Sequence, residues 1–177
     1  MTERQVRSVD MHDFEVRASQ REITGVVVPF DSPTQIGDYT ETFRRGAFAR
    51  TIAERGSRVK LLFAHDTARP LGRAVSLVEE KRGLVGTFKV ANTAAGNDAL
   101  ELVTSGAIDS FSVGFQPVVD EWSRSRDTVT RLSVKLLETS LVTLPAFEGA
   151  LIESVRSLQD YNPRRDPRII RARLAIL

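Results

Sequence analysis

Apolar and polar side chains alternate along residues 108–119, which read IDSFSVGFQPVV. This period of two is typical of a β-strand, because successive side chains point to opposite faces of a sheet. Phe111, Val113 and Phe115 share one face, whereas Ser112 lies on the other among small and polar neighbours. We therefore predict a strand that packs its phenylalanine face into the core and leaves its serine face open.

Most of the surrounding chain shows strand-like patterns as well. Strands are predicted in the ranges 14–30, 41–45, 59–64, 74–79, 84–90 and 128–144. The fourth and fifth of these form a hairpin, and we expect Gly83 to take the positive φ that such a turn uses. Residues 67–72 are rich in turn-forming types and are predicted to be a turn.

Helical spacing of apolar residues appears in three places. Helices are predicted for residues 47–56, for residues 93–106 with a cap at Asn92 or Thr93, and for residues 147–158. The sequence thus indicates a strand-dominated α+β fold. At 177 residues the chain fits one domain, which we place at 1–158, followed by an arginine-rich tail at 159–177.

The chain contains no cysteine and only two histidines, His12 and His65. Disulfides, thiolate nucleophiles and cysteine zinc sites are therefore excluded. The two histidines lie far apart and neither stands in an H-E-x-x-H frame, so we expect no metal and no cofactor. A general base acting near neutral pH is then one of these imidazoles or a buried carboxylate.

Charge and hydropathy limit the classes of partner that the chain could bind. No stretch approaches the roughly 18 apolar residues of a membrane span, and residues 1–10 lack the apolar centre of a signal peptide, which predicts a cytoplasmic protein that does not contact membrane. Five arginines against one aspartate fall in residues 161–177, and the remaining chain is slightly acidic. Nucleic-acid binding is not expected beyond weak contact through this tail.

Two residue types, a histidine and serines, suggest hydrolytic chemistry. His65 closes an apolar strand, and Ser110 and Ser112 are candidate nucleophiles if the imidazole lies within hydrogen-bond reach. Ser112 is favoured because Gly114 leaves room beside it. The alternative is that the histidine and the serines are purely structural.

A third, orienting group is either Asp66 or Glu138. Asp66 follows the histidine directly, so on a strand it would point to the opposite face. Glu138 is a charge within an apolar run, where a carboxylate needs a partner. That partner is His65 if the role is functional. It is an arginine if the role is structural, and the candidates are Arg69, Arg73 and Arg131.

Motifs in fixed order resemble the prohead serine proteases of tailed bacteriophages, over roughly residues 20–156. They are TGVVVPF at 24–30, ETF at 41–43, GAF at 46–48, LFAHD at 62–66, PLGR at 70–73, GLVG at 83–86, LVTSGAI at 102–108, FSVGF at 111–115, ETSLV at 138–142 and PA at 145–146. The resemblance assigns the family's catalytic histidine and serine to His65 and Ser112, and its glutamate to Glu138. It implies a fold similar to the herpesvirus assemblin proteases, a bent antiparallel β-barrel surrounded by helices. In those viral relatives the third member is a second histidine after the nucleophile, whereas His12 precedes the matched region, so no catalytic part is expected for it.

By this resemblance the chain is a serine endopeptidase that cleaves the major capsid protein precursor and its scaffold segment, and itself, during prohead maturation. It would act inside the assembling prohead in the bacterial host cytoplasm, with a homodimer as a further expectation. Gene transfer agents carry similar proteins, so by this resemblance the chain could come from a gene transfer agent as readily as from a phage. The alternative is a catalytically inactive, scaffold-like capsid-assembly protein of the same fold, against which the retention of all three residues argues.

Overall fold

Strands dominate the molecule, as the alternating patterns predict. A computed structural model describes residues 5–9, 21–144 and 152–156. The described elements, in chain order, are β1 (Gln5–Val9), β2 (Glu22–Pro29), β3 (Thr34–Ile36), β4 (Tyr39–Phe43), α1 (Ala49–Arg55), the 3-10 turn η1 (Gly56–Arg58), β5 (Lys60–Phe63), β6 (Asp66–Glu79), β7 (Gly83–Val90), α2 (Ala94–Thr104), β8 (Ser110–Trp122), β9 (Thr128–Val142) and β10 (Ile152–Arg156). The predicted fold class, strand-dominated α+β, is confirmed.

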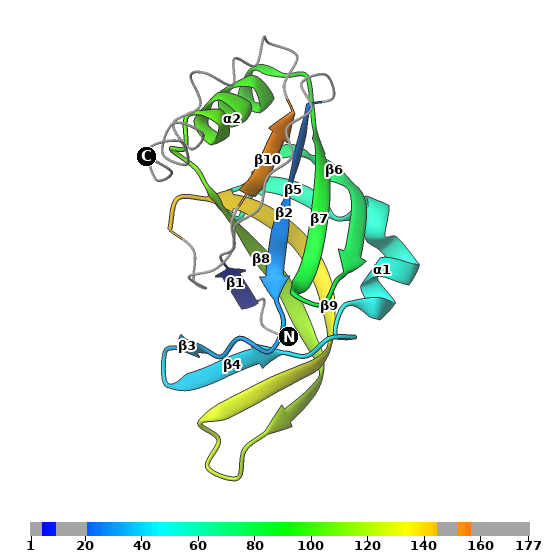
Figure 1. Ribbon diagram of the computed structural model, residues 1–177, viewed down its shortest axis with the longest axis vertical. Helices are drawn as coiled ribbons and strands as arrows, with labels where there is room; N and C mark the ends of the chain where they lie inside the picture. The colour runs from blue at the N-terminus through cyan, green and yellow to red at the C-terminus, as the bar shows by residue number, and fades with distance from the viewer. Residues whose placement is uncertain (1–4, 10–20, 145–151, 157–177) are drawn as a thin grey trace, which may run out of the picture.

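The strands belong to one bent sheet (Figure 1). Their order is β1-β8-β9-β5-β6-β7-β2-β10, and the β3–β4 hairpin joins it through β4 and β9. Neighbouring strands are antiparallel, with two exceptions. β4 and β5 each pair in parallel with β9, β4 along residues 128–131 and β5 along residues 138–141. The Ile152 N–H of β10 donates to the Asp109 carbonyl, 2.7 Å away and immediately before β8. The sheet therefore curls until its far end reaches the start of β8.

The core lies within the curl of the sheet. Phe43, Phe48 and Phe115 are fully buried there, and the Phe43 ring centroid lies 5.5 Å from that of Phe48 and 5.2 Å from that of Phe115. The helix α2 is capped at its N-terminus by Thr93, whose hydroxyl accepts a hydrogen bond from Gly96 N–H at 3.1 Å. This N-cap confirms one of the two predicted caps. Neither described helix is long and apolar enough to cross a membrane.

The predicted helix at 147–158 is wrong where the structure describes it, because residues 152–156 form β10, antiparallel to β2. The apolar residues of this short segment fit a helix or a strand equally well, and the free edge of β2 decides between them. The remaining residues of that prediction, His12, the proposed domain boundary at 158 and the tail at 159–177 lie outside the described residues.

Three local predictions also need correction. Residues 67–72 belong to the long strand β6, and the turn lies earlier, at Ala64 and His65. The hairpin β6–β7 is confirmed, but Gly83 does not have a positive φ. It is required because a Cβ there would lie 2.3 Å from the Val28 carbonyl oxygen of β2. The serine face of β8 is closed, since Ser112 is only 2% exposed.

Candidate active site

Three neighbouring strands carry the candidate site. Ser112 in β8 lies directly opposite Ser140 in β9, and Ser140 in turn lies beside Leu62 in β5. Glu138 shares a face of β9 with Ser140, because residues two apart in a strand point the same way. The chain leaves β5 after Phe63, and the turn that follows holds His65. His65 is 47 positions before Ser112 and 73 before Glu138 in the sequence, yet the fold brings all three residues together.

The structure brings together the serine, the histidine and the glutamate that the sequence singles out. His65 Nε2 lies 2.7 Å from Ser112 Oγ, and His65 Nδ1 lies 2.8 Å from Glu138 Oε1. We call these three residues the triad. The side chains of Ser112 and Glu138 are almost fully buried, whereas the His65 side chain is 22% exposed. The imidazole therefore lies between a buried hydroxyl and a buried carboxylate.

The tautomer of the imidazole is assigned from its two hydrogen-bond partners, with Glu138 taken as ionised. An ionised Glu138 only accepts hydrogen bonds, so His65 Nδ1 carries the proton that is donated to Oε1. His65 Nε2 is then an acceptor, and the Ser112 hydroxyl donates to it. This tautomer has a free lone pair directed at a hydroxyl, which is the arrangement that activates a serine as a nucleophile.

The turn that presents His65 has unusual backbone angles. Ala64 has φ +48° and His65 has φ +61°, and the flanking residues Phe63 and Asp66 are paired across the hairpin. Two positive φ values in a two-residue loop match a type I′ turn, which normally uses asparagine and glycine. The left-handed conformation costs about 1–2 kcal/mol for each of these L-residues. It is held by the bond from the Ala64 N–H to the Leu141 carbonyl, at 3.0 Å.

Ser140 is a further residue of this site that sequence reasoning does not single out. Its hydroxyl donates to Glu138 Oε2 at 2.7 Å and accepts the His65 backbone N–H at 3.0 Å. The same side chain thus binds the second oxygen of the carboxylate, Oε2, and the strained turn that carries the imidazole. The available signal is its position two residues after Glu138, which places both on one face of β9.

The alternative candidates for the nucleophile and for the orienting carboxylate form hydrogen bonds elsewhere. Ser110 donates to Asp109 Oδ1 at 2.6 Å, and Asp66 Oδ1 accepts the Ala68 N–H at 2.8 Å at the start of β6. The three arginines considered as structural partners of Glu138 are also engaged elsewhere. Arg69 lies over the Phe63 ring, Arg73 donates to the Ser57 and Ala74 carbonyls, and Arg131 binds Glu41 and Asp120. His65 is therefore the partner that Glu138 needs.

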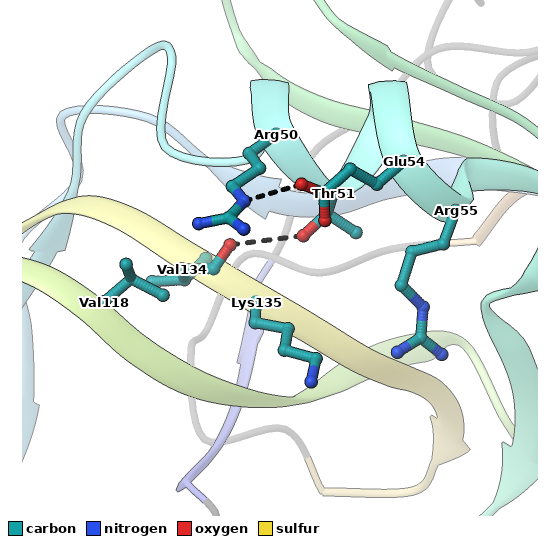
Figure 2. Close-up of a pocket in the computed structure, with 7 residues that line it drawn as sticks. All are labelled: Arg50, Thr51, Glu54, Arg55, Val118, Val134 and Lys135. Atoms are coloured by element: carbon teal, nitrogen blue, oxygen red, sulfur yellow. Dashed lines mark hydrogen bonds and ion pairs between the residues drawn. The ribbon is translucent and has the colours of Figure 1, made fainter.

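A cavity of about 150 Å³ lies away from the triad, between α1 and the strands β8 and β9 (Figure 2). Its lining residues are Arg50, Thr51, Glu54, Arg55, Val118, Val134 and Lys135. Within the described ranges, no group of three or more His, Cys, Asp or Glu side chains is placed to hold a metal ion. The chemistry of the candidate site thus depends on the triad and on Ser140 rather than on this cavity.

Three known proteins are similar to this chain in sequence or in fold. The prohead protease of Escherichia phage T5 is 26% identical over 102 residues, which make up 58% of this chain and 48% of that protein. The chain thus spans about half the length of this curated relative. The bacteriophage T4 capsid assembly protease gp21 has a similar fold, with a TM-score of 0.60 at 8% identity, over 78% of this chain and 96% of that chain. The varicella-zoster virus protease aligns with a TM-score of 0.41 at 16% identity, over 74% of this chain and 62% of that one.

The family comparison extends over nearly the whole chain. Residues 7–164 match the model of the caudovirus prohead serine proteases, a range that includes all three members of the triad. The chain therefore belongs to the caudovirus prohead serine protease family.

Proposed function

We propose that this chain is a serine endopeptidase of prohead maturation, with Ser112 as nucleophile, His65 as general base and Glu138 as the group that orients His65. The observation that carries the proposal is the unbroken path from Ser112 Oγ through the imidazole to Glu138 Oε1, in steps of 2.7 and 2.8 Å. Family membership and the protease names of the phage T5 and T4 proteins support this reaction class.

The reaction follows from the hydrogen bonds of the triad. Ser112 Oγ forms a bond to the carbonyl carbon of a peptide while its proton passes to His65 Nε2. Glu138 stabilises the imidazolium that results. The proton then moves from Nε2 to the leaving nitrogen as the C–N bond breaks, which leaves an acyl-enzyme. Water attacks the acyl carbon and gives a proton to Nε2, and Ser112 recovers its proton as the carboxylic acid product departs.

The proposed substrates are the major capsid protein precursor, its scaffold segment and the protease itself. Cleavage would occur inside the assembling prohead within the bacterial host. The protease would be encoded by a phage or by a gene transfer agent, and its active form would be a homodimer. The alternative function is a scaffold-like capsid-assembly protein that lacks catalysis. The tautomer and the bonding of the triad favour catalysis, since a merely structural histidine does not need a serine hydroxyl aligned on Nε2.

The test combines chemical labelling with proteolysis. A fluorophosphonate probe should label one residue, Ser112, as located by peptide mass spectrometry, and the chain should cleave a major capsid protein precursor. Ser112→Ala should abolish labelling and lower cleavage by a factor on the order of 10⁴ or more, because the attacking hydroxyl is lost.

Ser110→Ala is the matched control, because it removes a second buried hydroxyl from the same strand. It should leave labelling and cleavage close to wild type, since Ser110 bonds to Asp109 rather than to His65. Absence of both labelling and cleavage, with co-assembly into proheads intact, would instead favour the scaffold-like role.

A further inference from the structure

The strand β1 runs along the edge of β8 directly beside the nucleophile. It is antiparallel to β8 from Gln5, opposite Phe115, to Val9, opposite Phe111, and Ser8 lies opposite Ser112. Opposed residues in such a pair have Cα atoms about 4.5–5.5 Å apart. In Figure 1, β1 is the short dark blue arrow at the β8 side of the sheet. The backbone of β1 therefore passes next to the proposed reacting hydroxyl.

The other side of Ser112 is already filled. The triad extends from β8 across β9 to the turn after β5, so the carboxylate, the imidazole and Ser140 all lie on the β9 side. An extended peptide that pairs with β8 can then approach only along the opposite edge. That edge is occupied by β1, and Ser112 is 2% exposed.

A strand edge is a general site for binding extended peptides, because its free N–H and C=O groups pair with a peptide backbone of any sequence. We propose that the edge of β8 at Phe111–Phe115 is the binding site for an extended substrate peptide, and that β1 occupies it as an internal substitute that must leave before a peptide in trans is cleaved. This inference rests on the proposed protease function.

The pairing geometry allows β1 to leave without breaking the rest of the sheet. Within the described part of the chain it is five residues long and pairs only with β8, at one end of the strand order. The strand β8 itself stays paired with β9 along its length, from Ser110 opposite Val142 to Trp122 opposite Val129. Removing β1 therefore opens the edge beside Ser112 while the strands that carry the triad remain together.

A double variant, Arg7→Pro with Ser8→Pro, tests the proposal in the full chain. Adjacent strand residues direct their N–H groups to opposite sides, so one of the two prolines removes a bond to β8. We expect fluorophosphonate labelling of Ser112 to become at least tenfold faster than in wild type. A fluorescein-labelled peptide with the sequence of residues 3–10, ERQVRSVD, should bind the variant at least tenfold more tightly than wild type, by fluorescence anisotropy. A scrambled peptide should not bind.

The matched control is Ser154→Pro with Val155→Pro in β10, which is also five residues long and pairs only with β2. This variant should keep the wild-type labelling rate and the wild-type affinity for the peptide. Equal labelling and peptide binding in wild type and the β1 variant would overturn the inference. Loss of the thermal unfolding transition in the β1 variant alone would also overturn it, by showing that β1 is required for the fold.

Failure of the underlying function gives a different result. If no variant is labelled at Ser112, the protease proposal fails, and peptide binding to the β1 variant still decides whether the β8 edge accepts a strand. Labelling that is equal in all variants, by contrast, retains the protease and rejects the role of β1.

Discussion

The hydroxyl of Ser140 acts on two members of the triad at once. It donates to Glu138 Oε2 and accepts the backbone N–H of His65, in a position with no exposed surface. Without it, the carboxylate loses a buried donor and the positive-φ turn loses one of its bonds to β9. We therefore infer that Ser140 positions both the imidazole and the carboxylate, without touching substrate.

Ser140→Ala should lower kcat about tenfold to a hundredfold and leave KM nearly unchanged. Hydrogen bonds to charged groups contribute about 1.5–3 kcal/mol, and each 1.36 kcal/mol in the barrier changes a rate tenfold. Ser140→Thr restores a hydroxyl and should recover part of kcat. Steady-state kinetics on the capsid precursor checks both variants.

Thr139→Val is the control for this prediction. Thr139 is the adjacent buried residue of β9, and its hydroxyl makes no hydrogen bond within the part of the chain that the structure describes. Its removal should leave kcat unchanged. A Ser140→Ala variant with kcat within twofold of wild type would show that Ser140 is not a positioning residue.

The residues of the site differ in how visible they are in the sequence. Glu138 is detectable because a charge in an apolar run requires a partner, and the structure supplies the His65 imidazole. The catalytic roles of His65, Ser112 and Glu138 remain a prediction until they are tested. Ser140 is visible only through its position two residues after Glu138, which places both residues on one face of a strand. The turn at Ala64 and His65 is not detectable, because neither residue type favours a positive φ.

At the scale of single elements, α1 is attached to β9 by one buried hydroxyl. Thr51 Oγ1 donates to the Val134 carbonyl at 3.2 Å and accepts the Leu136 N–H at 3.0 Å (Figure 2 shows the first bond). Thr51→Val keeps the shape but removes both bonds. It should lower the free energy of unfolding by about 1–3 kcal/mol, because buried backbone groups of β9 are left unpaired.

Thr51→Ser keeps the hydroxyl and serves as the control, measured beside Thr51→Val by urea denaturation. Its loss should be smaller, because only a buried methyl group is removed, at about 0.8 kcal/mol. Equal losses in the two variants would assign the effect to packing instead of hydrogen bonding.

The turn between β8 and β9 contains a carboxylate, Asp127, that accepts several hydrogen bonds from neighbouring side chains. The pKa of Asp127 is lowered by hydrogen bonds from the Ser123 and Ser125 hydroxyls, each 2.7 Å from Oδ1. A carboxyl whose pKa is lower in the folded state stabilises the fold above its unfolded pKa, and this contribution is lost as the pH falls through the folded value. We expect the turn to loosen below about pH 4, the usual range of aspartate.

Amide chemical shifts of Ser123 and Thr128 followed between pH 6 and pH 2 check this. Asp127→Asn carries no titrating group and should remove the transition. A transition that persists in Asp127→Asn would place its origin in another carboxyl.

Element prediction from the sequence succeeds where local chemistry determines the outcome. The cap at Thr93 and the hairpin β6–β7 are confirmed because hydroxyl capping and turn-forming residues act within a few positions of each other. The helix predicted at 147–158 is wrong over residues 152–156, where the edge of β2, far away in sequence, accepts the segment as β10. The open serine face is wrong for the same reason, since distant segments cover it.

At the scale of the whole molecule, the strand order lies beyond sequence reasoning of this kind. The parallel pairing of β9 with both β4 and β5 joins segments separated by tens of residues, and no local signal specifies it. The parallel pairing of β5 places the turn with His65 beside Ser140 and Glu138. The candidate site is therefore a product of the topology, although its residue types are visible in the sequence.

One buried cation links β9 both to the distant strand β4 and to its hairpin partner β8. Arg131 of β9 is 1% exposed, and it donates from Nε to Glu41 Oε1 of β4 and from Nη1 to Asp120 Oδ2 of β8, each at 2.6 Å. Glu41 is fully buried. Removing the guanidinium leaves the buried Glu41 carboxylate and the Asp120 carboxylate, which is 19% exposed, without this counter-charge.

Arg131→Met should therefore lower the free energy of unfolding by about 3–5 kcal/mol, a drop of roughly 6–20 °C in Tm for a chain of this size, measured by calorimetry. The control is Arg44→Met. It removes an exposed ion pair, at 3.4 Å, between Arg44, which directly follows β4, and Glu121 of β8. It should cost less than about 1 kcal/mol, because water and salt screen exposed pairs. Adding Glu41→Leu and Asp120→Asn to Arg131→Met should restore much of the lost Tm, because no unpaired charge then remains buried. If the triple variant is no more stable than Arg131→Met alone, the loss comes from packing around the Arg131 side chain and not from the stranded carboxylates.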